Sequence, residues 1–297
     1  MSSCPLLTLN CGVQMPSLGF GVFLIDAART AETVNTALQS GYRLIDTAAV
    51  YDNEAEVGEG IRRSNIPRSE IFITTKLWVG DHGRDKTLRA FERSLSLLKT
   101  TYVDMYMLHW PNPLEWEKTV ESWKALIELR DGGSIRCIGV CNYNEENLER
   151  LYQESGVIPA VNQVELHPFF QQKSLRDFHR QKGIVTQAWS PLGGVRSYVD
   201  KAREVVLDVH SHPVLKRIGK KYGKSPAQIV LRWHIQEGGA ANPKSTHPER
   251  IRTNFQVFDF ELSEEDMTAI RSLDTGIRGG DDPQRVDAGT YPWHGEE

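Results

Sequence analysis

The sequence lacks a run of about 18 consecutive apolar residues, which is the length that a membrane-spanning helix needs. Its opening residues, MSSCPLLTLNCGVQ, contain no basic stretch followed by a long apolar one, so we expect no secretion signal. An excess of positive charge is also missing, because the formal net charge is −4. These absences predict a protein that binds neither membranes nor nucleic acid, and they favour a cytoplasmic location.

Cysteine is scarce, and the four that are present fit no zinc-binding spacing: Cys4, Cys11, Cys137 and Cys141. We therefore expect four reduced thiols, as in a cytosolic protein, and no metal site. The glycine-rich motif of a dinucleotide-binding doubly wound sheet is also incomplete. The sequence Gly19-Phe20-Gly21 has two of its glycines and lacks the third.

Short apolar runs alternate with helical patterns along the chain. No linker or low-complexity segment interrupts them, which predicts one domain over residues 1–297, with a hairpin within residues 1–17 and a tail over 276–297. The expected strands lie at residues 18–21, 43–46, 71–76, 103–108, 135–140, 160–166, 183–189 and 238–243. Eight strand–helix repeats favour an α/β fold of the (β/α)8 TIM-barrel type, with a doubly wound sheet as the alternative. The last run, GGAANP, is the weakest strand because alanine and asparagine have low strand propensity.

Three ionisable residues stand where predicted strands end. Asp46, Lys76 and His109 close the second, third and fourth strands, about one βα unit of roughly 30 residues apart, and Tyr51 follows Asp46 in the next loop. Taken singly, each has an ordinary explanation, such as a helix cap for Asp46 or a packed ring for Tyr51. In a barrel, however, the C-terminal ends of the strands meet on one rim, so these side chains should converge on a shared active site.

The residue types suit proton transfer at a carbonyl or alcohol oxygen. A phenol with an ordinary pKa of about 10 is a poor proton donor or acceptor until a neighbouring ammonium stabilises its phenolate. Lys76 can supply that charge, Asp46 can hold Lys76, and His109 can donate a hydrogen bond to the substrate oxygen. The chain shows no serine or cysteine nucleophile beside a base, which disfavours a nucleophilic enzyme, and no cluster with metal-ligand spacing, which disfavours a metal-dependent hydrolase.

A set of ordered motifs resembles the aldo-keto reductase family. They are GYRLIDTAAVYDNEAEVGEGIR, FITTKLW, YVDMYMLHWP, IGVCNY, VNQVELHP, QAWSPLG and NPKSTHPERIRTNFQVFDFEL, and they reach from the first hairpin to about residue 275. The resemblance implies a monomeric, cytosolic, NADPH-dependent carbonyl reductase on a (β/α)8 barrel. Its catalytic residues would be Asp46, Tyr51, Lys76 and His109, with Tyr51 as general acid. The QAWSPLG variant is similar to the branch of prostaglandin F synthases and 2,5-diketogluconate reductases.

The resemblance also implies where NADPH would bind. The nicotinamide carboxamide would contact Cys141, Asn142 and Gln163, and its ring would stack on Trp189. The pyrophosphate would lie along Ser190, Leu192 and Gly193, and further cofactor contacts would come from Gly21, Val22, Phe23, Asp46 and Pro191. The 2′-phosphate would be held by Lys244, Ser245, Thr246 and Arg250, and adenine would meet Asn254. Pro248 suits the first position of a helix whose N-terminus would face this phosphate.

The sequence departs from the family pattern at several of these positions. Cys141 stands where the family has serine, and a thiol is a weaker hydrogen-bond donor than a hydroxyl. Thr253 replaces a Glu or Gln near adenine, and His247 replaces a threonine. Ala240, Ala241 and Asn242 replace branched aliphatic residues, which should weaken the last strand and could shift Lys244.

The expected substrate pocket is apolar. Its walls would be Phe23, Tyr51, Trp78, His109 and Trp110, with Tyr291 and Trp293 of the tail as a cover. The long segment that follows Gly194 would fold over the cofactor. The partner is then a small-molecule carbonyl compound. The alternative is a barrel that binds NADPH as a sensor or docks a partner protein with little turnover, as the channel β subunits of this family do. An intact set of four catalytic residues favours the enzyme.

Overall fold

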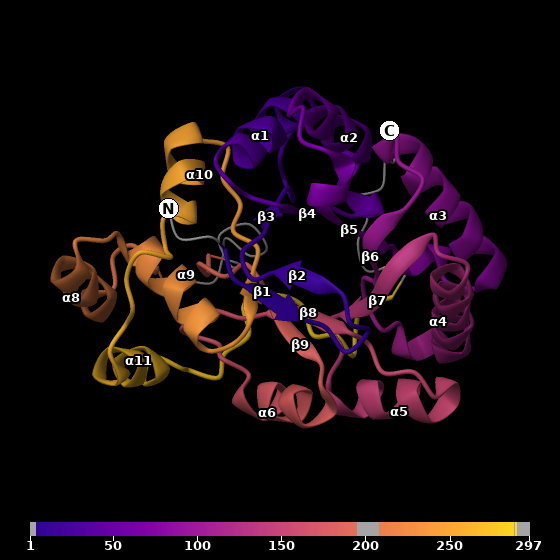
Figure 1. Ribbon diagram of the computed structural model, residues 1–297. Coiled ribbons are helices and arrows are strands. Elements are labelled where there is room, and N and C mark those ends of the chain that lie inside the picture. Colours follow the sequence, from indigo (N-terminus) through magenta and orange to yellow (C-terminus); the bar gives the residue numbers. More distant parts are fainter. Residues whose placement is uncertain (1–3, 195–207, 288, 290–297) are drawn as a thin grey trace.

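Eight parallel strands form the centre of the computed structural model, which describes residues 4–194, 208–287 and 289 (Figure 1). Their order follows the chain from β3 to β10, with each strand paired to the next. Their bounds are β3 Phe20–Gly21, β4 Leu44–Asp46, β5 Phe72–Leu77, β6 Val103–Leu108, β7 Ile135–Cys141, β8 Val161–Glu165, β9 Val185–Trp189 and β10 Ala240–Ala241. The (β/α)8 barrel that the sequence predicts is confirmed.

The barrel is closed beside its weakest strand. A parallel bridge joins Leu18 to Ala241, and the amide of Gly21 donates to the carbonyl of Pro243 at 3.1 Å. β10 itself keeps only the two alanines of the predicted run 238–243, in line with its low strand propensity. The close approach also depends on glycine. A Cβ atom on Gly19 would lie 2.3 Å from the Asn242 side chain, so no larger residue fits there.

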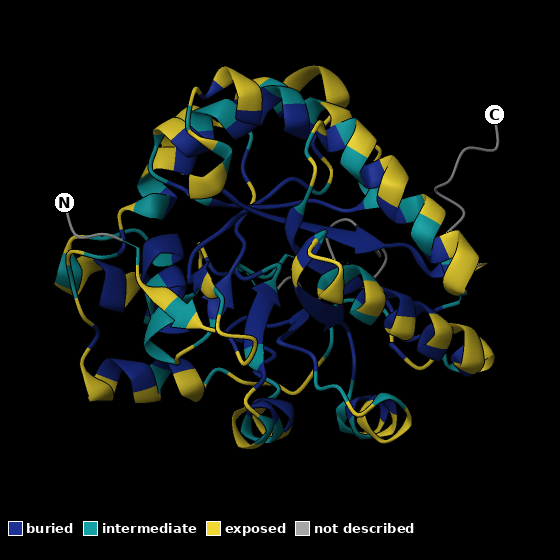
Figure 2. Cartoon of the chain, turned by 45° about the vertical axis from the view of Figure 1, so that its right-hand side comes forward, coloured by how far each residue is buried: buried dark blue, intermediate teal, exposed yellow. Residues whose placement is uncertain are grey.

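Helices surround the strands and turn their apolar faces inward, as the burial colouring shows (Figure 2). The α-helices are α1 Ala27–Gln39, α2 Glu54–Arg63, α3 Arg84–Leu98, α4 Trp116–Asp131, α5 Glu145–Ser155, α6 Lys173–Lys182, α8 Pro213–Tyr222, α9 Pro226–Gln236, α10 Pro248–Phe255 and α11 Glu264–Arg271. Short 3-10 helices are η1 Ala49–Tyr51, η2 Arg68–Glu70, η3 Val79–Asp81 and η4 Pro113–Glu115. Strands such as β5 and β6 are buried along their whole length, which explains why most of their residues are apolar or uncharged.

An antiparallel hairpin closes one end of the barrel. It consists of β1 Leu6–Thr8 and β2 Gln14–Pro16, and it crosses the barrel opening in Figure 1. Leu9 and Met15 enter the barrel interior and are almost fully buried there, among apolar side chains of the strands. The hairpin therefore completes the core at the end opposite to the C-terminal ends of the strands, and it leaves those ends open for a site.

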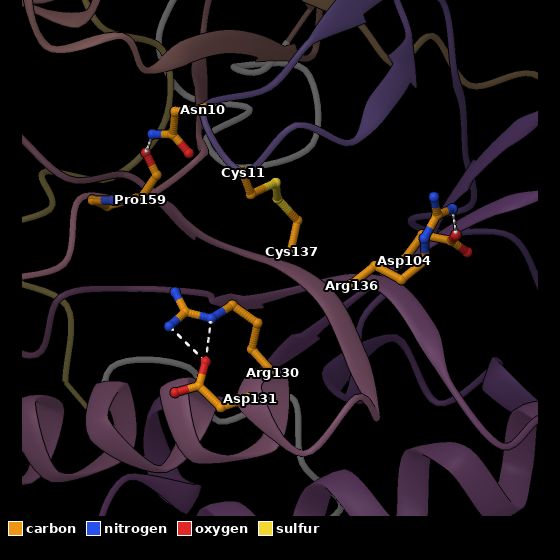
Figure 3. The surroundings of a disulfide bond; sticks show 8 residues. All are labelled: Asn10, Cys11, Asp104, Arg130, Asp131, Arg136, Cys137 and Pro159. Carbon is orange, nitrogen blue, oxygen red and sulfur yellow. Dashed lines mark hydrogen bonds and ion pairs between the residues drawn. A yellow bond between two sulfur atoms is a disulfide. The ribbon is translucent and has the colours of Figure 1, made fainter.

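The expectation of four reduced thiols is wrong for two of them. Cys11, at the tip of the hairpin, and Cys137, in β7, are joined by a disulfide with their Cα atoms 6.3 Å apart (Figure 3). The turn is also held by the Asn10 side chain, which donates to the carbonyl of Pro159 at 3.0 Å. The pairing joins residues 126 positions apart, so only the docking of the hairpin onto the barrel brings the two sulfurs together. Cys4 and Cys141 are free thiols.

Candidate active site

The strand-end residues meet on the rim opposite to the hairpin. Lys76 is fully buried and donates from its ammonium to Asp46 Oδ1 at 2.6 Å and to the carbonyl of Thr47 at 2.9 Å. It also donates to the Tyr51 hydroxyl at 3.4 Å. His109 stands beside this group, with its ring centre 5.7 Å from that of Tyr51. The four predicted catalytic side chains thus share one site, and Asp46 has the cationic partner that its burial requires.

Burial and charge together set the protonation of this group. Burial disfavours the charged form of Lys76, but the charge and the hydrogen bond of Asp46, together with the charges of Tyr51 and Cys141, outweigh this effect and raise the pKa of Lys76. Burial raises the pKa of Tyr51 to about 12, although the charge of Lys76 lowers it. Burial, helped by the charge of Lys76, brings the pKa of His109 well below its ordinary value. At neutral pH the site therefore holds a protonated phenol, an ammonium and an uncharged imidazole.

A chain of buried amides extends from Asp46 across the barrel interior. The Gln163 amide nitrogen donates to Asp46 Oδ2 and to Gln187 Oε1, both at 2.7 Å. The Gln187 amide nitrogen in turn donates to Asn242 Oδ1 at 3.3 Å. Both N–H groups of Gln163 thus have protein partners, which leaves its oxygen as the atom that can accept a hydrogen bond from a ligand. Gln187 and the Asn242 side chain were not singled out as functional in the sequence, because amides inside a strand carry no charge signal.

A cavity of about 390 Å³ opens above these residues. Among the predicted site residues, those that line it are Gly21, Phe23, Asp46, Tyr51, Trp78, His109, Trp110, Cys141, Asn142, Gln163, Trp189, Ser190, Pro191, Leu192, Gly193 and Lys244. Those outside its lining are Val22, Lys76, Ser245, Thr246, Arg250 and Asn254. Lining residues that the sequence did not point to are Leu24, Val50, Asn242, Pro243, Gly280 and Asp281. They come from loops and from the chain after α11, where no periodic pattern marks a position as functional.

Aromatic rings form the wall of this cavity around Tyr51. The ring centre of Phe23 lies 4.9 Å from that of Tyr51, and that of Trp78 lies 5.5 Å from His109. Trp110 packs in an apolar cluster with Trp78, Val79 and Val286. Among the described side chains of this aromatic wall, the polar atoms are the phenol oxygen, the imidazole nitrogens and the indole N–H groups of the two tryptophans. The predicted covers Tyr291 and Trp293, and residues 195–207 of the segment after Gly194, lie outside the described residues.

The cavity wall around Asn142 is bound together by its own hydrogen bonds. The Asn142 amide nitrogen donates to the carbonyl of His109 at 3.0 Å, and its oxygen accepts from the Trp189 indole at 2.8 Å. The thiol of Cys141 donates to the sulfur of Met107 at 3.5 Å. Because burial raises the pKa of Cys141, this thiol stays protonated and is no nucleophile.

The other end of the cavity is basic. Lys244 lies at its mouth, and desolvation by the surrounding protein lowers the pKa of Lys244 with no contribution from a carboxylate. Helix α10 begins beside it at Pro248, as predicted. The residue before the helix, His247, stands at the N-cap position, and its side chain makes no capping hydrogen bond. Within the described part of the chain no carboxylate contributes to the pKa of Lys244, and such a cation beside a helix N-terminus without a side-chain cap suits an anionic group such as a phosphate. The residues present therefore fit a phosphorylated cofactor.

The described residues contain neither a group of metal ligands nor a membrane-spanning helix. No three histidine, cysteine, aspartate or glutamate side chains gather where they could hold a metal ion. None of the helices in that part of the chain is long and apolar enough to span a membrane.

Comparison with known proteins agrees with this geometry. The model of the aldo/keto reductase family matches residues 18–275. Morphine 6-dehydrogenase of Pseudomonas putida is 50% identical over 291 residues, which cover 97% of both chains. The 9,11-endoperoxide prostaglandin H2 reductase of Trypanosoma cruzi is 47% identical over 278 residues, covering 93% of this chain and 94% of the relative.

The solved structures agree as well. The crystal structure of a Bombyx mori aldo-keto reductase in complex with NADP superimposes with a TM-score of 0.87 at 33% identity, covering 95% of this chain and 96% of that one. A relative that superimposes on this barrel thus holds NADP. The chain belongs to the aldo/keto reductase family and is an NADP-dependent oxidoreductase.

Proposed function

We propose that the chain reduces apolar aldehydes and ketones to alcohols, with Tyr51 as the proton donor. The observation that carries this proposal is the hydrogen-bonded line from Asp46 through Lys76 to the Tyr51 hydroxyl, which ends at the aromatic wall of the cavity. When bound, NADPH supplies the hydride that the carbonyl carbon receives. The protein's own residues then have to position the carbonyl oxygen and deliver a proton to it.

Tyr51 delivers that proton. Its hydroxyl is protonated at neutral pH, since burial raises the pKa of Tyr51 to about 12. As the carbonyl oxygen becomes negative, the O–H bond of Tyr51 breaks and the proton passes to that oxygen. The ammonium of Lys76, held by Asp46, stabilises the phenolate that remains. His109 is uncharged and acts as a hydrogen-bond donor that keeps the carbonyl oxygen near the phenol.

The cofactor lies, in this proposal, along the polar side of the cavity. Asn142 and the free oxygen of Gln163 would hold its carboxamide, and Trp189 would pack against its ring. The loop from Ser190 to Gly193 would hold the pyrophosphate. Lys244, Ser245, Thr246 and Arg250 would hold the 2′-phosphate, and Asn254 would contact adenine.

The aromatic wall sets the substrate class. Apolar walls favour substrates that bury apolar area, at about 25 cal/mol per Å², and they offer no partners for the hydroxyl groups of a sugar. We therefore expect aromatic and long-chain carbonyl compounds to be preferred over open-chain sugars. The similarity to a 9,11-endoperoxide prostaglandin H2 reductase adds a bulky apolar endoperoxide as a second candidate substrate, in which a hydride and a proton would cleave the O–O bond to give two hydroxyl groups.

The decisive experiment is NADPH oxidation, followed at 340 nm, with a panel of carbonyl compounds. The panel contains aromatic aldehydes, long-chain ketones, short aldehydes and open-chain sugars, and prostaglandin H2 is assayed beside it as an apolar endoperoxide. The highest kcat/KM should belong to the apolar compounds. A clear preference for sugars would contradict the substrate class, and no turnover of any compound would contradict the reductase function.

We further propose that the chain works as a monomer in the cytoplasm. Structural disulfides are rare in reducing compartments. A cytoplasmic location therefore requires that the Cys11–Cys137 disulfide persists in such a compartment. Thiol titration of protein alkylated directly in a cell lysate tests the location, and sedimentation tests the monomer.

A further inference from the structure

A buried carboxylate at the end of β8 has no part in the proposed chemistry. Glu165 is fully buried, and its two oxygens accept hydrogen bonds from consecutive backbone amides, Oε1 from Gly279 at 2.7 Å and Oε2 from Gly280 at 2.8 Å. A third bond joins Oε1 to the His167 ring at 3.0 Å. These bonds offset the free-energy cost of burying the carboxylate charge, since charge-assisted hydrogen bonds are about twice as strong as neutral ones.

The amides belong to the segment after α11, which we name the strap and define as residues 276–287. The strap crosses the barrel rim directly over β8 and β9, where Glu165 and Trp189 are neighbours in register. A Cβ atom on Gly280 would lie 2.7 Å from the Trp189 ring and 3.1 Å from Glu165 Oε2. Glycine thus lets the strap backbone lie close enough for both amides to reach the carboxylate.

The strap also forms part of the cavity. Gly280 and Asp281 line it directly, and Val286 is buried in the cluster that includes Trp78 and Trp110. Before and after the glycines it has two further contacts: the Arg278 guanidinium lies 4.9 Å from the centre of the Phe170 ring, and Gln284 donates to Asn147 at 3.1 Å. The strap therefore connects the Glu165 anchor to the apolar wall.

We propose that Glu165 is a positioning residue that determines substrate specificity by clamping the strap. The carboxylate holds Gly279 and Gly280, and this sets Val286 against Trp78 and Trp110. The clamp thereby holds the strap against the cavity wall that a bulky substrate contacts, whereas a short aldehyde needs only the phenol and the imidazole. The inference rests on the proposed carbonyl reduction, but the clamp itself is a contact that can be measured without turnover.

The substitution that tests the clamp is Glu165→Gln. A carboxamide keeps the size of the side chain but has one acceptor oxygen, and its NH2 group would face one of the two amide N–H groups of the strap. Buried N–H groups without an acceptor are costly, so the strap should detach more often. Glu92→Gln is the matched control, because Glu92 is an exposed residue of α3.

Limited proteolysis of the NADPH-bound protein provides the first measurement. Trypsin can cut the strap after Arg278 and Arg285, and we expect cleavage in Glu165→Gln to be about tenfold faster than in wild type. A tenfold change corresponds to about 1.4 kcal/mol in the equilibrium between clamped and released strap. Glu92→Gln should be cut at the wild-type rate. Equal cleavage of all three proteins would overturn the clamp.

Kinetics provide the second measurement. For a long aromatic ketone, Glu165→Gln should raise KM about tenfold while kcat stays within about twofold, since the substrate loses strap contacts and the catalytic residues are unchanged. For a short aldehyde both constants should stay near wild type. If KM rose equally for both substrates, or if kcat fell for both, Glu165 would have no role in specificity.

A second variant tests the proposal independently, in case Glu165→Gln does not fold. Gly280→Ala leaves the carboxylate in place and displaces the strap through the Cβ contact with Trp189, so it should give the same faster cleavage and the same KM split. Wild-type behaviour of Gly280→Ala in both assays would contradict the proposal. If wild type turned over no carbonyl compound, the proposed function would fail, whereas the proteolysis result would still decide whether Glu165 holds the strap.

Discussion

At the scale of single residues, the proposed reaction depends on one hydroxyl group. Tyr51→Phe removes the proton donor without changing the shape of the cavity, so kcat should fall by at least about 100-fold. NADPH binding, measured by fluorescence titration, should be unchanged, because the phenol contacts Lys76 rather than any group assigned to the cofactor phosphates. Lys76→Met should also be severely impaired, since it removes the charge that stabilises the phenolate. Retention of most activity by Tyr51→Phe would rule out this mechanism.

The pH dependence follows from the same hydroxyl group. Reduction needs the protonated phenol, and the pKa of Tyr51 is raised to about 12, so the competent form persists until the pH approaches that value. The pKa of His109 is lowered well below its ordinary value, so the imidazole stays uncharged throughout the neutral range. We expect kcat at saturating NADPH to be flat from about pH 6 to 9 and to decline only at higher pH. A decline centred near pH 7, seen in buffers of constant ionic strength, would show that another group controls the step.

The cofactor preference depends on two cations. Lys244 and Arg250 are proposed to bind the 2′-phosphate, which NADPH has and NADH lacks. Hydrogen bonds to charged groups contribute about 1.5–3 kcal/mol each, so Lys244→Met with Arg250→Met should weaken NADPH binding by two orders of magnitude or more. NADH binding should barely change. Calorimetric titration of both cofactors decides the matter, and an equal loss for both would place the phosphate elsewhere.

Some residues of the site can be predicted from the sequence and others cannot, and the difference depends on their charge and on where their partners lie. Asp46, Lys76 and His109 were predictable because an ionisable side chain at the end of a buried strand is rare without a partner. Gln187 and the Asn242 side chain carry no charge, so their place in the amide chain appears only when neighbouring strands are in register. Glu165 is charged, but its partners are backbone amides of residues more than a hundred positions away, which no local pattern marks.

At the scale of secondary-structure elements, buried strands were the easiest to predict. The run 103–108 is β6 without any change of bounds, because both of its faces are covered and every residue is apolar or paired. β10 contracts to Ala240–Ala241, since part of the barrel closure is made by Leu18 and by backbone bonds outside a regular strand. The disulfide was not predictable, because it depends on where the hairpin docks.

The hairpin is the element whose attachment can be tested. The Cys11–Cys137 disulfide closes a long loop, so Cys11→Ser should lower the free energy of unfolding by about 2–4 kcal/mol, and reductant should have the same effect on wild type. Turnover should stay near wild type, because the hairpin closes the end of the barrel opposite to Tyr51. Urea denaturation with and without reductant measures the effect, and Cys4→Ser is the control, since Cys4 is a free thiol. Identical curves with and without reductant would exclude the disulfide.

At the scale of the whole molecule, the cavity combines segments from most of the chain. Its wall includes the loop after β3, the aromatic residues after β5 and β6, the loop after β9 and the strap. The barrel pattern predicts the first three, because loops after strands form the rim. The strap has no periodic pattern, so the residues that it brings to the cavity could be found only from the structure.

We expect these segments to select the substrate together, because all of them line the cavity. Trp110 is the residue that lies between the aromatic wall and the strap. It is buried at the cavity wall in contact with Trp78 and with Val286 of the strap. Trp110→Ala should raise KM for a bulky apolar ketone by at least about tenfold, because a buried aromatic side chain contributes large contact area, and only the larger substrate reaches it. KM for a short aldehyde should stay within about twofold, and Trp110→Phe should fall between wild type and Trp110→Ala for the ketone. Leu114→Ala, at an exposed position outside the cavity, is the control and should change neither constant. Equal losses for both substrates would instead make Trp110 a residue of the core, whose removal disturbs the site as a whole rather than the wall that selects the substrate.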